Sequence, residues 1–538
     1  MIKKQSLFPI LVLILMLVSC KTNTNSGVSK TNQDFIYLEG KTFKLKNKDF
    51  FPVMINYVVS FRKIGNEYLL SPIREYENPE IFETNTKDSL ETQLRAHFKL
   101  IKEMGFNSLR IAFDRVGEED LKYFYGADHQ KLYIKKDYNE IFNGLEKLLK
   151  ILSEFDLKVM LLIKAPVENR DLEEFTIRML NRFQSNPSIF AYDFFNEPLY
   201  FDQIQLPNHL QKRAKVKAFH IVSKWKRMMK EYAPHQLFTI GFSEPIEVFE
   251  WDPEILPVDF LSFHTYNPLR VPNEIYWYGK YTTKPWMIGE TALPADNDSI
   301  SYEEQSQFMR EVYQGVVDCG GSGLAWWQFQ DVPTGGLEAK FTGIIDHKGT
   351  TTTKDGKYTI LGSVKPAVKE IAKFRDYKAK PPLRMVNYYN MLGYNNIVLC
   401  GQIVNSTDGK PIEGAVIRGW NESWGIGMNT FTNEKGCFTL YSNDVCVHFE
   451  ISAPKMSKIK FDYHTKYYPL TADGCTIQSL PNQSLEYHSI SYKSFLLPII
   501  QSDSIPSDFQ IFNFDSAKFN QAKLKGFMGI KKLQNLSL

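Results

Sequence analysis

The chain is poor in cysteine and has almost no excess of charge. Only 6 of its 538 residues are cysteine, and no spacing among them is typical of a zinc site. Lys and Arg number 64 against 61 Asp and Glu, so the formal net charge is only +3. A balance this close to neutral provides no electrostatic footprint for nucleic acid. The composition therefore argues against a zinc protein and against a nucleic-acid-binding protein.

The chain also contains no apolar run long enough to span a bilayer. Its most conspicuous apolar run lies near the N-terminus. Residues 7–18 form a run of 12 residues, too short to span a bilayer but the right length for a signal peptide. The run leads into Leu-Val-Ser-Cys at Cys20, which resembles a bacterial lipobox with Cys20 as the lipidated residue. The alternative is an ordinary signal peptide with an incidental cysteine. We expect residues 1–20 to be a lipoprotein signal peptide and residues 21–34 a flexible tether.

These expectations place the protein at the bacterial cell envelope, held at the membrane through Cys20 on the periplasmic or the cell-surface face. An exported protein could pair some of its five remaining cysteines, although their number is odd. A free buried thiol is the expectation for Cys319. The others are Cys400, Cys437, Cys446 and Cys475.

Aromatic residues, in contrast, are abundant at 14%, and two short apolar runs end on a glutamate. The first ends Asn196-Glu197-Pro198, and the second ends at Glu290. A carboxylate at the end of a buried strand is costly unless it has a function. In a parallel barrel the C-terminal strand ends form the active site, so two such glutamates can face each other. Paired carboxylates are what glycoside cleavage requires, and aromatic faces suit sugar rings.

The pattern of apolar runs predicts strand–helix alternation repeated eight times, which is an α/β fold with a (β/α)8 barrel. Continuous apolar runs are typical of strands buried on both faces. Asp88-Ser-Leu-Glu91 is typical of a capping box at the start of a helix. The strands are expected at 51–57, 105–113, 157–165, 190–197, 237–242, 259–266, 286–290 and 323–329, and the clearest helices near 88–101, 141–155, 216–229 and 365–374.

Around the two glutamates the chain resembles the retaining β-glycosidases of glycoside hydrolase clan A, most closely family 5. In that family an Asn-Glu-Pro closes strand four and carries the acid/base, and a second Glu closes strand seven as the nucleophile. The resemblance therefore implies that Glu197 is the acid/base and Glu290 the nucleophile, 93 residues further along. It also implies that Asn196 hydrogen-bonds the sugar 2-hydroxyl.

The same resemblance extends to other strand ends. Arg110, in Gly-x-Asn-x-x-Arg, is expected to hydrogen-bond the nucleophile and keep it ionised. His264 and Tyr266 lie two residues apart and so point to one side; the family His contacts the substrate or the acid/base, and the Tyr hydroxyl touches the nucleophile. Trp327 resembles the Trp beneath the sugar at the cleavage site, whereas Trp326 is expected to face the helix layer.

Two features concern substrate choice. Many family 5 cellulases carry a His after strand three, and residues 164–166 here read Lys-Ala-Pro, which puts the cellulase branch in doubt. Trp251, Trp277 and Tyr278 lie in predicted loops and are candidates for sugar subsites.

The pattern changes after the predicted barrel, which spans 35–378. Residues 379–395 are expected to form a linker. Residues 396–500 lose helical periodicity and show short alternating runs between turns such as Asp-Gly at 408. This region resembles the carboxypeptidase regulatory-like β-sandwich, an accessory module without catalytic residues. Residues 501–538 form a polar tail.

The sequence thus predicts a retaining hydrolase of a β-linked poly- or oligosaccharide, mannanase- or glucanase-like, that requires no metal and no cofactor. Glu197 should have a raised pKa as the general acid. The alternatives are a catalytically silent glycan-binding lipoprotein, a transglycosylase using the same two glutamates, and a structural envelope protein. Mannan, glucan, xylan and host glycans all stay open as substrates.

Overall fold

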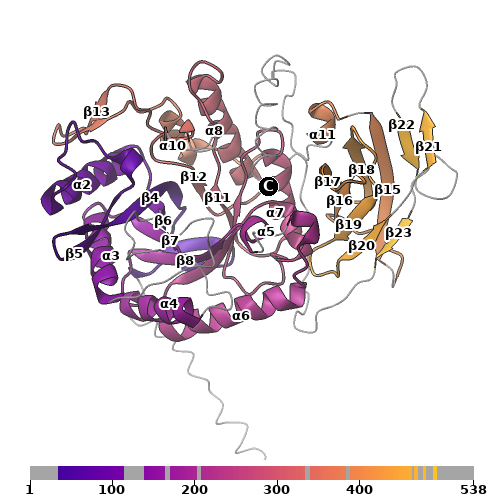
Figure 1. The fold of residues 1–538 in the computed structure, drawn as a ribbon, viewed down its shortest axis with the longest axis horizontal. Helices are drawn as coiled ribbons and strands as arrows, with labels where there is room; N and C mark the ends of the chain where they lie inside the picture. The colour runs from indigo at the N-terminus through magenta and orange to yellow at the C-terminus, as the bar shows by residue number, and fades with distance from the viewer. Residues whose placement is uncertain are drawn as a thin grey trace, which may run out of the picture.

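The computed structural model describes the barrel and most of the β-rich region that follows it (Figure 1). The predicted signal peptide with Cys20, the segment 164–166, Cys475 and the tail 501–538 lie outside the described residues. Among the described residues, no helix has the length and apolarity needed to cross a bilayer. The described ranges are 34–113, 138–163, 170–202, 207–333, 340–382, 388–394, 396–405 and 408–462, together with three strands at 466–469, 476–479 and 489–492.

The first large sheet is a closed barrel. It has nine strands, of which β5 (Glu67–Pro72) pairs antiparallel with β4 and lies outside the ring. The other eight are parallel, and β12 closes the ring by pairing with β4. This confirms the predicted (β/α)8 fold. The barrel strands are β4 (Val53–Ile64), β6 (Ser108–Phe113), β7 (Lys158–Leu162), β8 (Ile189–Asn196), β9 (Leu237–Phe242), β10 (Leu261–His264), β11 (Trp286–Glu290) and β12 (Leu324–Trp326).

The strands are buried on both faces, as their continuous apolar runs predicted. Every residue of β6, β8 and β11 is buried. The bounds of β9 and β11 agree with the predicted ones, and the others differ by a few residues. The helices around the barrel are α2 (Lys87–Glu103), α3 (Tyr138–Ser153), α4 (Arg170–Phe183), α6 (Lys215–Tyr232), α7 (Val271–Tyr281), α8 (Tyr302–Asp318) and α10 (Val368–Lys373).

One helix start was predicted wrongly. The Asp88–Glu91 segment is not a capping box, because α2 begins earlier and its N-cap is Thr86, whose side chain accepts from the Ser89 N–H. A full capping box does occur at α8, where Ser301 and Glu304 bond each other's backbone.

A small antiparallel sheet closes the N-terminal end of the barrel. Its strands are β1 (Tyr37–Glu39), β2 (Thr42–Leu45) and β3 (Lys48–Asp49). Phe43 from β2 is fully buried and packs edge-on against Phe190 and Phe260. The opposite end of the barrel, where the strands finish, is the end that carries the polar side chains described below.

The region after the barrel forms two facing β-sheets with an apolar core between them, which confirms the predicted β domain. The resemblance to the carboxypeptidase regulatory-like module and the domain borders stay predictions. Cys319, Cys437 and Cys446 are free thiols, and Cys319 is buried as expected. One sheet contains β15 (Ile397–Asn405), β18 (Cys437–Ser442), β21 (Lys466–Pro469), β22 (Thr476–Ser479) and β23 (Ser489–Tyr492), and the other β16 (Val416–Trp420), β17 (Gly427–Phe431), β19 (His448–Ser452) and β20 (Ile459–Asp462).

The β domain is attached to the flank of the barrel near α6 and α7, as Figure 1 shows at the right of the view. Val416 and Phe431 belong to the same apolar cluster as the barrel core. The Trp277 indole donates to the Gly414 carbonyl at 2.9 Å. Lys215, at the start of α6, donates to the Met456 carbonyl at 2.6 Å. The two domains therefore share a packed interface.

Candidate active site

The two predicted glutamates lie at the C-terminal end of the barrel. Glu290 is the last residue of β11, and Glu197 directly follows β8. Glu197 has a left-handed backbone (φ 46°, ψ 69°) and precedes the short helix α5 (Pro198–Phe201). For a residue with a side chain this conformation costs about 1–3 kcal/mol and is typical of functional sites. The turn aims the Glu197 side chain back over the strand ends.

Glu197, His264 and Glu290 converge on one point. One nitrogen or oxygen atom from each lies within 4.8 Å of the others. His264 Nδ1 lies 2.9 Å from Glu197 Oε1 and 3.6 Å from Glu290 Oε1. A pair of carboxyl groups about 5–5.5 Å apart suits a double displacement, whereas a separation of roughly 6.5–9.5 Å suits direct attack by water.

Arg110, on β6, contacts four other residues of the site. Its side chain is fully buried, its Nη1 donates to Glu290 Oε1 at 2.5 Å and its Nε donates to Asp193 Oδ2 at 2.9 Å. The remaining donors reach Asn196 Oδ1 at 2.9 Å and Asn56 Oδ1 at 3.1 Å. Burial alone lowers the pKa of Arg110, but the Asp193 and Glu290 carboxylates outweigh burial, so the net direction is upward. Arg110 is therefore a permanent cation beside Glu290.

The environments of Glu197 and His264 set their protonation. Burial raises the pKa of Glu197 to about 7, although the positive charge of Arg110 opposes the shift. Burial lowers the pKa of His264 to about 4. At neutral pH His264 is therefore an uncharged hydrogen-bonding partner, and Glu197 is protonated in a substantial fraction of molecules.

The other predicted residues are brought to the same place. The Tyr266 hydroxyl donates to Glu290 Oε2, so both carboxylate oxygens of Glu290 have donors. Asn196 uses its Oδ1 for Arg110, which leaves the Nδ2 group for another acceptor. Trp326 is fully buried, donates to the Thr342 carbonyl and packs edge-on against Phe308 of α8, whereas Trp327 is half-buried. The predicted place of Trp327 beneath the sugar stays a prediction.

Two members of the network were missed in the sequence. Asn56, on β4, donates to the carbonyls of Gly289 (3.0 Å) and Trp326 (3.2 Å) and accepts from Arg110. Asp193, on β8, is fully buried and neutralises Arg110. The available signal was an Asn or Asp inside an otherwise apolar strand, because such a residue is costly without a partner.

Glu247 is a third carboxylate near the site that the sequence did not single out. It lies in the 3-10 helix η4 (Pro245–Phe249) and accepts from the backbone of Leu199 at 3.0 Å and from the Ser243 hydroxyl at 2.9 Å. Burial raises its pKa to about 8, and these hydrogen bonds oppose the shift. Its contact with Leu199 anchors the helix that follows Glu197.

The prediction that three aromatic residues form sugar subsites was wrong. Trp251, Trp277 and Tyr278 are fully buried, and the last two belong to α7 rather than to a loop. Their rings fill the space between the helix layer and the strands, and the Trp277 indole is used at the domain interface. They are therefore core residues and do not line the candidate site.

The donor set of Glu197, His264 and Glu290 could in principle hold a divalent cation, since carboxylate oxygens and an imidazole are suitable ligands. However, both oxygens of Glu290 already accept from Arg110 and Tyr266, and Arg110 adds a positive charge at the same point. Arg110 and Tyr266 therefore compete with any metal ion for the oxygens of Glu290.

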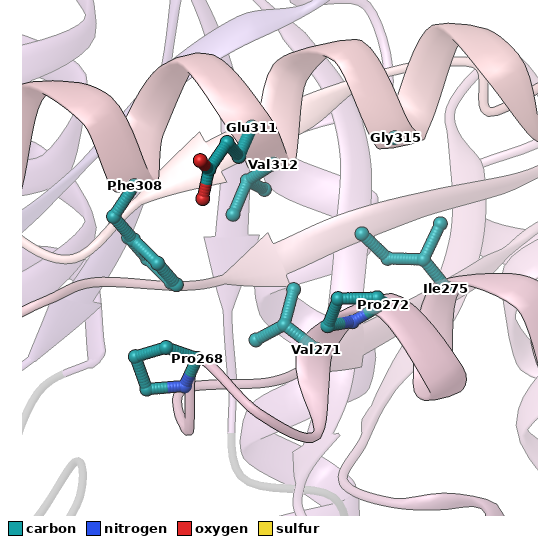
Figure 2. Close-up of a pocket in the computed structure, with 8 residues that line it drawn as sticks. All are labelled: Pro268, Val271, Pro272, Ile275, Phe308, Glu311, Val312 and Gly315. Atoms are coloured by element: carbon teal, nitrogen blue, oxygen red, sulfur yellow. The ribbon is translucent and has the colours of Figure 1, made fainter. Parts of the chain in front are cut away.

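A separate apolar pocket lies between α7 and α8 (Figure 2). It has an empty volume of about 290 Å³, and Glu311 contributes the one carboxylate to its lining. None of the site residues above contributes to it, so it belongs to the helix layer and not to the carboxylate pair. It is lined by Pro268, Val271, Pro272, Ile275, Phe308, Glu311, Val312 and Gly315.

No protein-family model and no curated protein matches the chain. Among solved structures, an endo-1,4-β-mannanase from Rhizomucor miehei is similar with a TM-score of 0.43 and 14% identity, over 63% of this chain and 99% of that chain. A β-mannanase from the blue mussel Mytilus edulis has a TM-score of 0.37 and 12% identity, over 55% of this chain and 91% of that chain. A calcium-binding mutant of Bacteroides uniformis β-glucuronidase 2 has a TM-score of 0.43 and 14% identity, over 84% of this chain and 53% of that chain.

Proposed function

We propose that the protein is a retaining hydrolase of a β-linked poly- or oligosaccharide. The observation that carries the proposal is the close approach of the two carboxylates, with atoms of Glu197, His264 and Glu290 within 4.8 Å of one another at the strand ends. An approach of two oxygens to within 4.8 Å supports the separation of about 5–5.5 Å that suits a double displacement better than the roughly 6.5–9.5 Å that suits direct attack by water.

In the first step Glu290 attacks the anomeric carbon while Glu197 gives its proton to the leaving oxygen. The raised pKa of Glu197, about 7, keeps this proton available near neutral pH. Arg110 and Tyr266 hold Glu290 in position by donating to its two oxygens. In the second step Glu197 acts as the base for a water that releases the sugar from Glu290.

The test is a panel of β-linked glycans, including mannan, glucan and xylan, with the chain truncated after the tether. Glu197→Gln and Glu290→Gln are assayed beside it. We expect one glycan to be cut, both variants to lose the activity, and proton NMR of the fresh product to show the β anomer first. Cleavage by Glu290→Gln at the wild-type rate, or an α product, contradicts the mechanism. Longer products on the same glycan would identify a transglycosylase, and binding without cleavage would identify a glycan-binding protein.

We also propose that the chain is lipid-anchored at the cell envelope through Cys20. The proposal rests on the apolar run and the lipobox-like ending of the N-terminal segment. Expression in a bacterium with a radiolabelled fatty acid should label the wild type but not Cys20→Ser. A wild-type chain without label contradicts the anchor and leaves the hydrolase proposal untouched.

A further inference from the structure

The β domain reaches the rim of the barrel mouth on the side of Glu197. Its strand β16 packs against η4, which follows β9. Tyr200, three residues after Glu197, donates to Glu244 Oε1 at 2.8 Å beside η4. From the short helix α11 (Tyr388–Met391), the Tyr388 hydroxyl accepts from Asn267 Nδ2 at 3.1 Å. Residues from beyond the barrel therefore lie next to the segments that carry the catalytic residues.

Arg418 lies on the face of β16 that is turned toward the barrel. Successive side chains of a strand point to opposite faces. Val416 packs in the barrel core cluster, and Ile417 packs in the core of the β domain. Arg418 therefore shares a face with Val416, with Asn429 and Glu450 beside it on the neighbouring strands.

Arg418 has no carboxylate within ion-pair distance among the residues that the structure describes. Its guanidinium stacks on the ring of Trp420, 4.8 Å from the centroid. The neighbouring Glu450 is contacted by Lys460 at 3.3 Å and by Lys458 at 3.9 Å. The nearby Arg270, in contrast, forms ion pairs with Glu244 and Glu274. Arg418 thus forms no ion pair with the described residues, and Glu450, whose charge acts on it, is already contacted by two lysines.

Electrostatic effects around Arg418 indicate a positive local potential. Burial is the largest effect on the pKa of Arg418 and lowers it, and the charge of Arg270 lowers it further. The hydroxyls of Tyr200 and Tyr389 and the carboxylate of Glu450 act in the opposite direction. Burial also lowers the pKa of His209, and the charges of Lys460 and Arg418 lower it further. A partly desolvated guanidinium in a positive field gains free energy when an anion binds to it.

We propose that Arg418, held by Trp420 and flanked by Tyr389, binds the leaving-group part of the glycan and that this part carries a carboxylate, as in a uronic acid unit. The inference rests on the proposed function, because Glu197 protonates the leaving oxygen. Tyr200 on α5 donates its backbone N–H to the Glu197 carbonyl and its hydroxyl to Glu244 beside η4, against which β16 packs. A guanidinium fork matches a planar carboxylate with two parallel hydrogen bonds. The neighbouring Tyr389 is half-buried and offers a ring and a hydroxyl to a sugar.

The experiment compares three sets of probes. The first are β-linked oligosaccharides whose reducing-end unit is glucuronic acid, and the second are their uncharged methyl esters. The third are sulfated analogues of these uncharged compounds. The proteins are the wild type, Arg418→Gln, Arg418→Lys and the control Arg178→Gln on the exposed face of α4, with the melting temperature of each recorded. Binding is measured in the Glu290→Gln background, and kcat/KM is measured with the nucleophile intact.

We expect the acid to bind at least about tenfold more tightly than its methyl ester, as one charge-assisted contact implies. Arg418→Gln should remove this preference while binding to the ester changes less than about twofold, and Arg418→Lys should keep part of it. Arg178→Gln should retain the full preference. Equal binding of acid and ester by the wild type overturns the proposal, as does a preference that survives in Arg418→Gln. Tighter binding of the sulfated analogue than of the carboxylate overturns the assignment to a carboxylate.

The two proposals fail in different ways. Acid-dependent binding that requires Arg418, without cleavage of any probe, supports the anionic site and contradicts the hydrolase. Cleavage of neutral glycans with no acid preference supports the hydrolase and contradicts the anionic site. If Arg418→Gln lowers the melting temperature strongly, the salt dependence of the wild-type preference decides, because a charge contact should weaken several-fold between 0.05 and 0.5 M NaCl.

Discussion

The two ends of the barrel strands are built from opposite kinds of residue. At the N-terminal end, Met54, Met160 and Met287 pack with Phe43 of the small sheet in a dry cluster. At the C-terminal end, β4, β6, β8 and β11 carry a buried network of Arg110 with its carboxylate and amide partners. One end therefore stabilises the fold through apolar area, and the other holds charges whose cost is tolerated because they are paired.

Within one sheet, the residues expected to determine stability therefore lie at the opposite end from those expected to determine activity. A residue at the apolar end should affect the free energy of unfolding and leave turnover alone. A residue of the polar network should affect turnover first, and stability only when its loss leaves a buried charge without a partner. The predictions below test this separation.

The largest effect is expected for Glu290→Gln. The variant keeps the shape of the side chain and removes the proposed nucleophile, so kcat should fall by at least about 10⁴-fold. Arg110 keeps Asp193 as its partner, so the melting temperature should change little. Steady-state kinetics on the glycan found in the panel, together with thermal unfolding, check both points. A loss of activity that is matched by unfolding would contradict the separation.

Arg110→Met should impair both properties. It leaves Asp193 and Glu290 as buried carboxylates without their shared cation, which costs about 3–5 kcal/mol of folding free energy. It also removes the donor to Glu290, the proposed nucleophile, so kcat should fall as well. Denaturant titration and kinetics at a temperature where the variant is folded measure the two losses. An unchanged unfolding midpoint would show that the network does not depend on Arg110.

Phe43→Ala is the matched variant at the opposite end of the barrel. The ring is fully buried between Phe190 and Phe260, so its removal should cost about 3–5 kcal/mol through lost burial and a cavity. Since Phe43 touches none of the catalytic residues, kcat below the melting temperature should stay within about twofold of the wild type. A large drop in kcat in the folded variant would break the contrast between the two ends.

The smallest effect is expected for the pH dependence of kcat/KM, which should follow the protonation of Glu197. Its pKa is raised to about 7, chiefly by burial, so the protonated acid is lost as the pH rises through 7. kcat/KM should therefore fall by about tenfold per pH unit above this point. Because the folded pKa is raised above the unfolded value, the protonated Glu197 also stabilises the fold at low pH, and this contribution is lost as the pH rises toward 7. Glu197→Gln should flatten the stability curve between about pH 4.5 and 7.

From the sequence it was possible to predict those site residues whose type is unusual at the end of a strand. Glu197 and Glu290 were predicted because a carboxylate closing an apolar run is unusual, and Arg110 and His264 followed from the family resemblance. Asn56 was missed because a polar residue within an apolar strand does not indicate its partner. Trp277 was wrongly assigned to a loop, because an aromatic residue between predicted strands is equally compatible with a loop surface and with a buried helix face.

Local sequence patterns determined the barrel itself, because strand and helix periodicity and apolar continuity act over a few residues at a time. They also determined which residue types stand at the strand ends. Only the tertiary structure decided that Arg110 serves Glu290, Asp193, Asn196 and Asn56 at once, and that Arg418 of the β domain faces the barrel beside α5. These arrangements join residues far apart in the chain, and their distances follow from how strands close into a ring and how two domains pack.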